Sequence, residues 1–164
     1  MTLAEINAMD QATFVATLGW VFEHSPWIAE GAWTSRPFAT REALHEAMAR
    51  IVREADVARQ LDLIREHPDL GARARMSDAS VGEQAGAGLD QLTPAEFNRL
   101  QSLNADYRQK FGFPFIYAVK GSTKHDIIQA LETRLASTPT AELDTALKQI
   151  ERIAWFRLSD AITI

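Results

Sequence analysis

The sequence predicts an all-α protein, a single-domain bundle of about seven to nine helices that spans residues 1–164. Ala, Leu, Glu, Gln and Arg, which favour helices, dominate the chain, and alternating β-branched residues are scarce. Apolar residues recur at helical spacing, without an internal repeat or a low-complexity linker. A length of 164 residues is that of one ordinary domain, and 46% hydrophobic with 24% charged residues is typical of a soluble globular protein.

The pattern of apolar residues in the first part of the chain predicts one helix, followed by a segment whose helical period is interrupted. Apolar residues at helical spacing indicate a helix over about residues 11–22. Pro26, Gly31 and Pro37 then break the period, although several apolar residues lie between them. We therefore expect turns rather than a continuous helix there.

Two more helices are expected before residue 68. Thr40 and Asp56 are residue types that cap helix N-termini, and an apolar stripe follows each of them. The helix after Asp56 should end near the sequence EHP, because the residue before Pro68 is sterically pushed out of the helical conformation.

A loop and a long helix are expected next. Residues 69–92 are small, polar and rich in glycine, which is typical of a loop. Thr93 can cap a helix, Pro94 suits its first turn, and Glu96 completes a capping box. This helix should stop around Gly112, since glycine often follows a helix C-terminus.

The run FGFPFIYAVKG, residues 111–121, is the one strand-like stretch of the sequence. Its proline and its glycines also fit a buried extended loop. Ser122 or Thr123 can cap the following helix, and Thr138 opens the last helix, whose apolar face continues to Leu158.

Composition and charge exclude several classes of function. The net charge is −5 and no basic cluster stands out, so we expect no nucleic-acid partner. No apolar run approaches the roughly 20 residues that span a bilayer, and the N-terminus carries early acids and no basic leader, so neither a membrane span nor a signal peptide is expected. Cysteine is absent, which removes disulfides and thiolate chemistry and is compatible with a cytoplasmic location.

Known cofactor and nucleophile motifs are also missing from the sequence. The four histidines lack the HExxH spacing of a zinc helix, so we predict no metal site. We find no Walker loop, no dinucleotide-binding glycine fingerprint and no GxSxG nucleophile elbow.

Two loop-like segments place titratable groups beside glycine, namely EHPDLGARA (residues 66–74) and SVGEQAGAGL (residues 80–89). His67 in the first segment can hold or give a proton near neutral pH. Glu83 in the second can orient such a histidine and stabilise its charged form. The amide of Gln84 can donate and accept hydrogen bonds, which suits a ureido or imide group.

Purely structural explanations of these residues stay open at this point. His67 could be an exposed residue at the negative end of a helix dipole. Glu83 could belong to a capping box that begins at Ser80. Backbone amides of residues 111–121 could donate to a ligand, because an extended and partly unpaired run leaves such groups available.

Three motifs together give the sequence a recognisable pattern: HPDLGARA, SVGEQAGAGL and FGFPFIYAVKG. In this order and spacing they resemble the decarboxylases of 2-oxo-4-hydroxy-4-carboxy-5-ureidoimidazoline (OHCU) in urate degradation. The resemblance runs over nearly the whole chain. It implies an all-helical, cofactor-independent enzyme, often a homodimer, that converts OHCU to (S)-allantoin in the last step of urate oxidation to allantoin.

The resemblance also implies roles for individual residues. His67 corresponds to the catalytic acid, and Glu83 corresponds to its carboxylate partner. Arg157 corresponds to a basic residue of the site, with Arg152 as the alternative. Pro68 and residues of the second segment would line the substrate site, namely Ser80, Val81, Gly82 and Gln84. Backbone groups of the third motif would hold the ring, namely those of Ile116, Tyr117, Ala118, Val119 and Lys120.

The implied reaction is physically coherent with these residues. Loss of CO₂ leaves two electrons on carbon, which delocalise into an adjacent carbonyl or imine, and donors placed at that group lower the barrier. A ring that already offers an electron sink needs no pyridoxal or thiamine cofactor. Glu83 could orient His67, bind the substrate hydroxyl, or disfavour the substrate carboxylate electrostatically.

Two other functions remain possible on sequence grounds. One is a ring-opening hydrolase for a related ureide, with His67 as base. The other is a non-catalytic helical interaction module, in which the motifs are only turns. The enzyme interpretations require His67, Glu83 and residues 116–120 to converge, whereas the interaction module would leave them scattered and expose apolar groups on one helix face.

Overall fold

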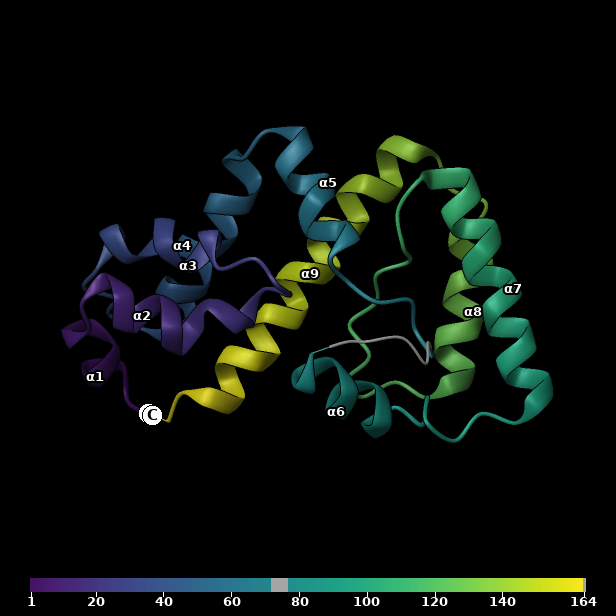
Figure 1. The fold of residues 1–164 in the computed structure, drawn as a ribbon, viewed down its shortest axis with the longest axis horizontal. Helices are drawn as coiled ribbons and strands as arrows, with labels where there is room; N and C mark the ends of the chain where they lie inside the picture. The colour runs from purple at the N-terminus through teal and green to yellow at the C-terminus, as the bar shows by residue number, and fades with distance from the viewer. Residues whose placement is uncertain (72–76, 164) are drawn as a thin grey trace. The chain divides into compact units, whose positions relative to one another are not determined.

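The computed structural model describes residues 1–71 and 77–163, and these residues are helical without any β-strand (Figure 1). They contain nine α-helices and two short 3₁₀ helices, which confirms the all-α prediction. The α-helices are α1 (Leu3–Ala8), α2 (Gln11–Leu18), α3 (Trp27–Ala32), α4 (Arg41–Glu54), α5 (Val57–Arg65), α6 (Asp78–Gly86), α7 (Pro94–Phe111), α8 (Lys124–Arg134) and α9 (Pro139–Ala161). The 3₁₀ helices are η1 (Gly19–Val21) and η2 (Trp33–Ser35). Among the described residues, no helix combines the length and the apolar character that crossing a bilayer requires.

The chain divides into two compact units. The first unit comprises Met1–Glu66 and Ile150–Ile164, and the second comprises His67–Gln149. The assignment of residues 1–164 to one domain stays a prediction.

Local cap chemistry explains most helix starts. Thr40 and Asp56 cap α4 and α5 as predicted, each with its side-chain oxygen accepting from a backbone N–H. Thr93 caps α7 and forms the predicted capping box with Glu96. Of the two candidates for α8, Thr123 is the cap. These contacts satisfy N–H groups that have no partner inside the helix.

Several expectations for the first unit need correction. The helix predicted over residues 11–22 is instead α2 followed by the 3₁₀ helix η1, which begins at Gly19. The N–H of Ser25 then donates to the carbonyl of Phe22 and forms a turn after η1. The interrupted segment after Pro26 nevertheless forms α3, since a proline just before a helix or in its first turn is tolerated. An unpredicted helix, α1, begins at a capping box made by Thr2 and Glu5.

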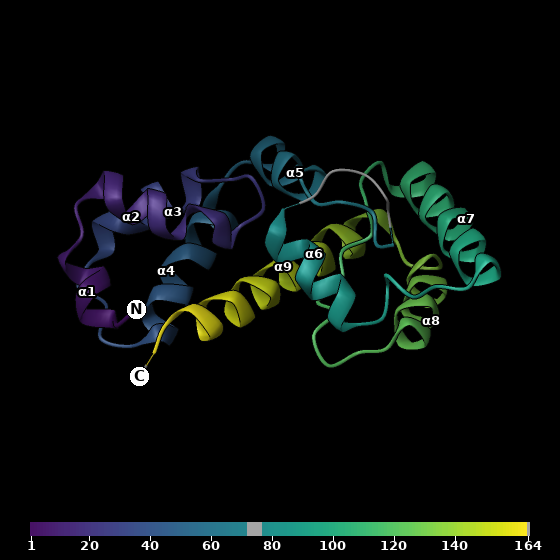
Figure 2. The same ribbon diagram turned by 60° about the horizontal axis from the view of Figure 1, so that its bottom comes forward.

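The first unit is built around α3, which packs against α2 and α4 (Figures 1 and 2). Its core consists of fully buried apolar side chains, among them Ile6, Phe14, Leu18, Ile28, Leu44 and Met48. The two ends of the chain meet in this unit. Thr2 and Thr163 form an isolated parallel bridge, and the N–H of Thr163 donates to the carbonyl of Met1 at 2.8 Å.

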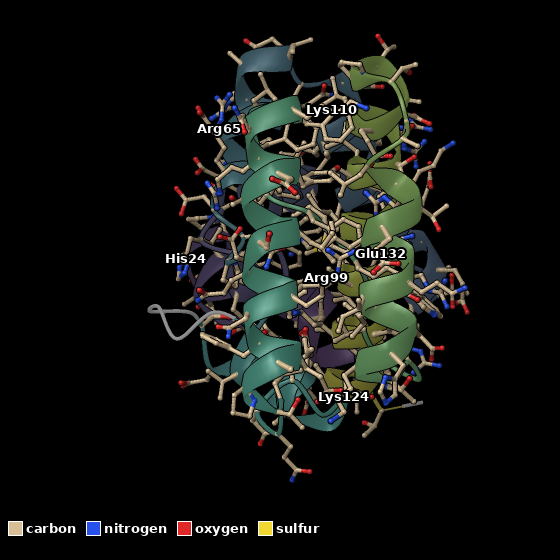
Figure 3. The ribbon with its side chains drawn as sticks, turned by 90° about the vertical axis from the view of Figure 1, so that its right-hand side faces the viewer. His24, Arg65, Arg99, Lys110, Lys124 and Glu132 are labelled. Carbon is tan, nitrogen blue, oxygen red and sulfur yellow. The ribbon has the colours of Figure 1, made fainter. Side chains whose placement is uncertain are left out.

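In the second unit α7 and α8 lie side by side (Figures 1 and 2). Figure 3 shows Arg99 of α7 and Glu132 of α8 pointing toward each other, and Arg99 Nη2 lies 3.0 Å from Glu132 Oε1. Of the two alternatives for the run after α7, the structure has the extended loop and not the strand, and the Ile116 carbonyl and the Ala118 N–H bond to side chains. Residues 69–92 are not all loop, since they contain α6.

Candidate active site

His67 lies directly after α5, at the point where the helix ends. The N–H of Glu66 closes the last turn of α5, and Pro68 follows one residue after the histidine. The side chain of His67 is buried, with the residue only 7% exposed, so the interpretation of His67 as an exposed helix-end residue is wrong. A largely buried imidazole in a short non-helical connection is held in place by its surroundings, as a proton donor must be.

The turn that follows His67 is fixed by three side chains from other elements. The N–H of Gly71 donates to Gln84 Oε1 at 2.9 Å, and Asn104 Nδ2 donates to the carbonyl of Leu70 at 3.0 Å. Arg108 Nη2 pairs with Asp69 Oδ1 at 2.9 Å. Because α6 and α7 both bind this turn, they determine where it lies within the second unit. The remainder of the motif HPDLGARA, residues 72–74, lies outside the described residues.

Helix α6 presents the second motif. Its N-cap is Ser77, whose Oγ accepts from the N–H of Ser80, so the interpretation of Ser80 as the first residue of a capping box is wrong. Ser80 and Gln84 form the buried face of the helix, and each is 6% exposed. Glu83 is half-buried, beside Gln84 in sequence. Since Gln84 binds Gly71, the Glu83 and His67 segments are brought together within the second unit.

The exposed side of α6 carries Val81 and Gly82. Val81 is 50% exposed, and a Cβ added to Gly82 would meet no atom within 4 Å. Packing therefore does not explain the glycine, although glycine in a helix interior is unfavourable relative to alanine.

The extended run after α7 is held by side chains that sequence reasoning did not identify. Gly112, with φ 79°, ends α7 in the left-handed conformation that favours glycine. Arg134 Nη1 then donates to the carbonyl of Ile116 at 2.5 Å, and the N–H of Ala118 donates to Gln149 Oε1 at 2.9 Å. The carbonyl of Val119 accepts from the N–H of Ser122 at 3.0 Å.

Some backbone groups of the same run have no hydrogen-bond partner among the described residues. They include the N–H groups of Tyr117 and Val119. Backbone amides of a largely buried segment are normally paired. Unpaired amides on a fixed, extended backbone are suitable donors for a ligand that carries carbonyl groups.

Arg157 belongs to the first unit and is almost completely buried. Its Nη2 lies 2.9 Å from Glu23 Oε2, and its Nη1 donates to the carbonyls of Val21 and Trp20 at 3.2 and 3.3 Å. Arg152, the alternative, is exposed, with its guanidinium 5.5 Å from the ring centroid of Phe156. His67, Glu83 and residues 116–120 lie in the second unit, and the role of either arginine stays a prediction.

The described residues contain no group of three or more His, Cys, Asp and Glu side chains that could hold a metal ion. In the second unit they include a buried histidine, a half-buried carboxylate, a buried amide and a fixed extended backbone, and the hydrogen bond between Gly71 and Gln84 connects the histidine segment to α6. Such a set can move one proton and hold a small polar heterocycle.

Comparison with known proteins identifies similar chains over nearly the full length. The model of the family described as OHCU decarboxylase matches residues 7–159. The chain is 45% identical to the 2-oxo-4-hydroxy-4-carboxy-5-ureidoimidazoline decarboxylase of Halalkalicoccus jeotgali, over 98% of this chain and 91% of that protein. It is 36% identical to the mouse protein of the same name, over 99% of this chain and 93% of that protein.

A longer relative and two solved structures are also similar. The chain is 51% identical to the uric acid degradation bifunctional protein PucL of Bacillus subtilis, over 99% of this chain, and spans 33% of that protein. A crystal structure of (S)-allantoin synthase superposes with a TM-score of 0.82 at 34% identity, covering 99% of this chain and 54% of that one. A crystal structure of OHCU decarboxylase in the presence of (S)-allantoin superposes with a TM-score of 0.70 at 25% identity, covering 82% and 89%.

Proposed function

The chain belongs to the OHCU decarboxylase family, and we propose that it is a carboxy-lyase that converts OHCU to (S)-allantoin without a cofactor. The observation that carries this proposal is the match over nearly the whole of both chains to relatives named for this decarboxylase. The arrangement of the second unit supports it, because the turn after His67 is bonded to α6, which carries Glu83.

The chemistry divides into two steps. The bond between ring carbon 4 and its carboxylate carbon breaks, CO₂ leaves, and the electron pair spreads into the adjacent imine, whose nitrogen takes up a proton. A proton then adds to the neighbouring carbon, which carries the ureido group, and the hydroxyl on carbon 4 loses its proton and becomes a carbonyl. The second step sets the configuration of the product, so the proton must come from one side of the ring.

His67 is proposed as the group that delivers this proton. It is buried at the end of α5, and the turn after it is held by Gln84 and Asn104. Glu83 is proposed as its partner or as a ligand of the substrate hydroxyl, and Arg157 as the basic residue of the site. A hydrogen bond from a well-placed donor to the developing charge contributes roughly 3 kcal/mol to such a reaction.

The remaining substrate contacts are proposed on the same basis. Pro68 and the α6 residues Ser80, Val81, Gly82 and Gln84 line the site, and the backbone from Ile116 to Lys120 holds the ring. The amides of Tyr117 and Val119, which have no partner in the part of the chain that the structure describes, fit the carbonyl groups of a ureide. A cytoplasmic location and a homodimeric state are proposed from the family resemblance and from the absence of cysteine.

The configuration of the product provides the test. Freshly generated OHCU should decay faster with the protein, release CO₂, and give only (S)-allantoin, as followed by circular dichroism and chiral chromatography. Spontaneous decay gives racemic allantoin, so a racemic product at the uncatalysed rate would refute the proposal. A ring-opened product that retains the carboxylate would instead indicate the hydrolase.

A further inference from the structure

We propose that Arg134 is a positioning residue for the decarboxylation: it fixes the peptide between Ile116 and Tyr117 so that the N–H of Tyr117 is presented to the substrate. This inference rests on the proposed function, because it concerns the backbone that is proposed to hold the ring. It adds a residue from α8 that neither the sequence motifs nor the family resemblance assigned to the site.

Arg134 makes three contacts with its surroundings. Its Nη1 donates to the carbonyl of Ile116 at 2.5 Å, and its Nε donates to Glu142 Oε1 at 2.7 Å. The guanidinium carbon lies 4.4 Å from the ring centroid of Phe115. Because the guanidinium is planar and is held by contacts on different sides, its orientation is fixed.

The carboxylate that orients Arg134 is itself fixed. Glu142 is only 1% exposed, and Oε1 accepts from the hydroxyl of Tyr107 at 2.5 Å. Tyr107 is fully buried, and burial raises the pKa of its hydroxyl well above the usual value, with the hydrogen bond to Glu142 acting in the same direction. The hydroxyl therefore remains a donor at physiological pH, and Tyr107, Glu142 and Arg134 form a network that ends on the carbonyl of Ile116.

A contribution to the stability of the fold does not by itself explain why Tyr107, Glu142 and Arg134 form this buried network. Arg134 Nη2 is buried and has no hydrogen-bond partner among the described residues, and an unsatisfied buried donor costs free energy. Apolar side chains often replace a buried ion pair without loss of stability. The network does, however, place one strong donor on one particular carbonyl.

The planarity of the peptide bond converts that contact into an orientation for Tyr117. The carbonyl of Ile116 and the N–H of Tyr117 belong to one peptide unit, and in a trans unit they point in opposite directions within one plane. Arg134 binds this carbonyl, so the N–H of Tyr117 points away from the guanidinium. That N–H has no partner among the described residues.

The next peptide unit is fixed from its other side. Gln149 accepts from the N–H of Ala118 at 2.9 Å, which orients the carbonyl of Tyr117. Tyr117 therefore presents a donor and an acceptor whose directions are set by Arg134 and Gln149. A ureide carries adjacent N–H and C=O groups, which are complementary to such a pair.

The test compares Arg134→Met and Arg134→Lys with the wild type. Methionine keeps an apolar stem over Phe115 and loses both hydrogen bonds, so the KM for OHCU and the Kd for (S)-allantoin should rise about ten- to a hundredfold. The kcat should change less than the KM. Lysine, which can still donate to the carbonyl of Ile116, should restore part of the binding.

Two control variants separate positioning from general destabilisation. Leu131→Ala removes a fully buried apolar side chain from the same helix, and should lower stability without changing the KM. Arg99→Met removes an arginine from the exposed pair with Glu132, and should change neither quantity. An unchanged KM in Arg134→Met, or an equal KM rise in Leu131→Ala, would overturn the inference.

A readout that does not depend on turnover completes the test. In the wild type, (S)-allantoin should shift the amide resonance of Tyr117, and this shift should be lost in Arg134→Met and reduced in Arg134→Lys. If Arg134→Met does not fold, the lysine variant decides alone. A wild type that does not release CO₂ from OHCU contradicts the proposed function, whereas an active wild type with unaltered Arg134 variants contradicts only the role of Arg134.

Discussion

Arg157 Nη2 and Glu23 Oε2 lie 2.9 Å apart, and their side chains are 5% and 0% exposed. The two residues are far apart in sequence, and the ion pair joins α9 to the segment after η1 within the first unit. A charge in such a place depends strongly on its partner, because removing one member leaves the other buried and uncompensated.

Replacing Glu23 by glutamine should therefore destabilise the protein by about 3 kcal/mol, a typical cost of breaking a buried pair. Urea unfolding at pH 7 measures the free energy of unfolding of the variant and of the wild type. Glu46→Gln is the matched control, since its pair with Arg53 is about half exposed on both sides and should contribute less than about 1 kcal/mol. An equal loss of unfolding free energy in the two variants would show that burial does not increase the contribution of the Glu23–Arg157 pair.

His67→Asn should reduce the kcat for OHCU by about 10²- to 10⁴-fold, the usual contribution of a general acid or base. The far-ultraviolet circular dichroism spectrum should stay unchanged. His125→Asn serves as the control, because His125 is 75% exposed at the start of α8 and should retain full activity. Normal turnover by the His67 variant would exclude its role as the acid.

Gly71→Ala should destabilise the protein more than Gly88→Ala, by about 1–3 kcal/mol. Both glycines have left-handed φ angles, 74° and 82°, so both substitutions add similar backbone strain. Only at Gly71 would the new Cβ collide with another side chain, since it would lie 2.6 Å from Leu100 Cδ2. Thermal unfolding of the pair measures the difference, and equal effects would show that Leu100 moves aside freely.

Gly82→Ala should stabilise α6 by about 0.5–1 kcal/mol, because alanine is the better helix former and the added methyl group meets no atom. If Gly82 lines the site, the same methyl group should raise the KM for OHCU. Gly86→Ala provides the comparison, since Gly86 also has open space and ends the same helix. A Gly82 variant that is more stable and has an unchanged KM would remove Gly82 from the site.

Glu96 makes the stability of the second unit sensitive to acid. A hydrogen bond from Lys124, 2.7 Å long, and one from the N–H of Thr93 lower the pKa of Glu96 from 4.5 to about 2. The lowered pKa means that its contribution is fully present above pH 4.5 and is lost as the pH falls toward 2. The melting temperature of Glu96→Gln should therefore fall less than that of the wild type over this interval. Lys124→Met, which removes the largest cause, should reduce the acid sensitivity as well.

Local chemistry explains which parts of the fold were predictable. Thr40, Asp56 and Thr93 cap their helices through contacts with residues three positions away, so the sequence contains both partners within one turn. Helix α1 has the same kind of signal in Thr2 and Glu5, and could have been predicted from it. Helix α6 was obscured because its glycines weaken the helical pattern, although Ser77 caps it normally.

The candidate site was predictable only where short motifs carry it. His67, Glu83 and Gln84 stand beside glycines or a proline and attract attention as a pattern. Arg134 and Gln149 look like ordinary polar residues of helices, and their contacts with the backbone of residues 116–118 connect segments far apart in sequence. Glu23 and Arg157 illustrate the same limit, because only the folded chain brings them together.

The bridge between Thr2 and Thr163 has a practical consequence for engineering. Since the segments of Thr2 and Thr163 run alongside each other, a linker of a few residues could join them, and the chain could be opened at an exposed turn such as Gly121–Ser122. The resulting circular permutant would keep every helix whole. Because the linker would hold the two segments together covalently, comparing the permutant's free energy of unfolding with that of the wild type would measure how much the non-covalent pairing contributes.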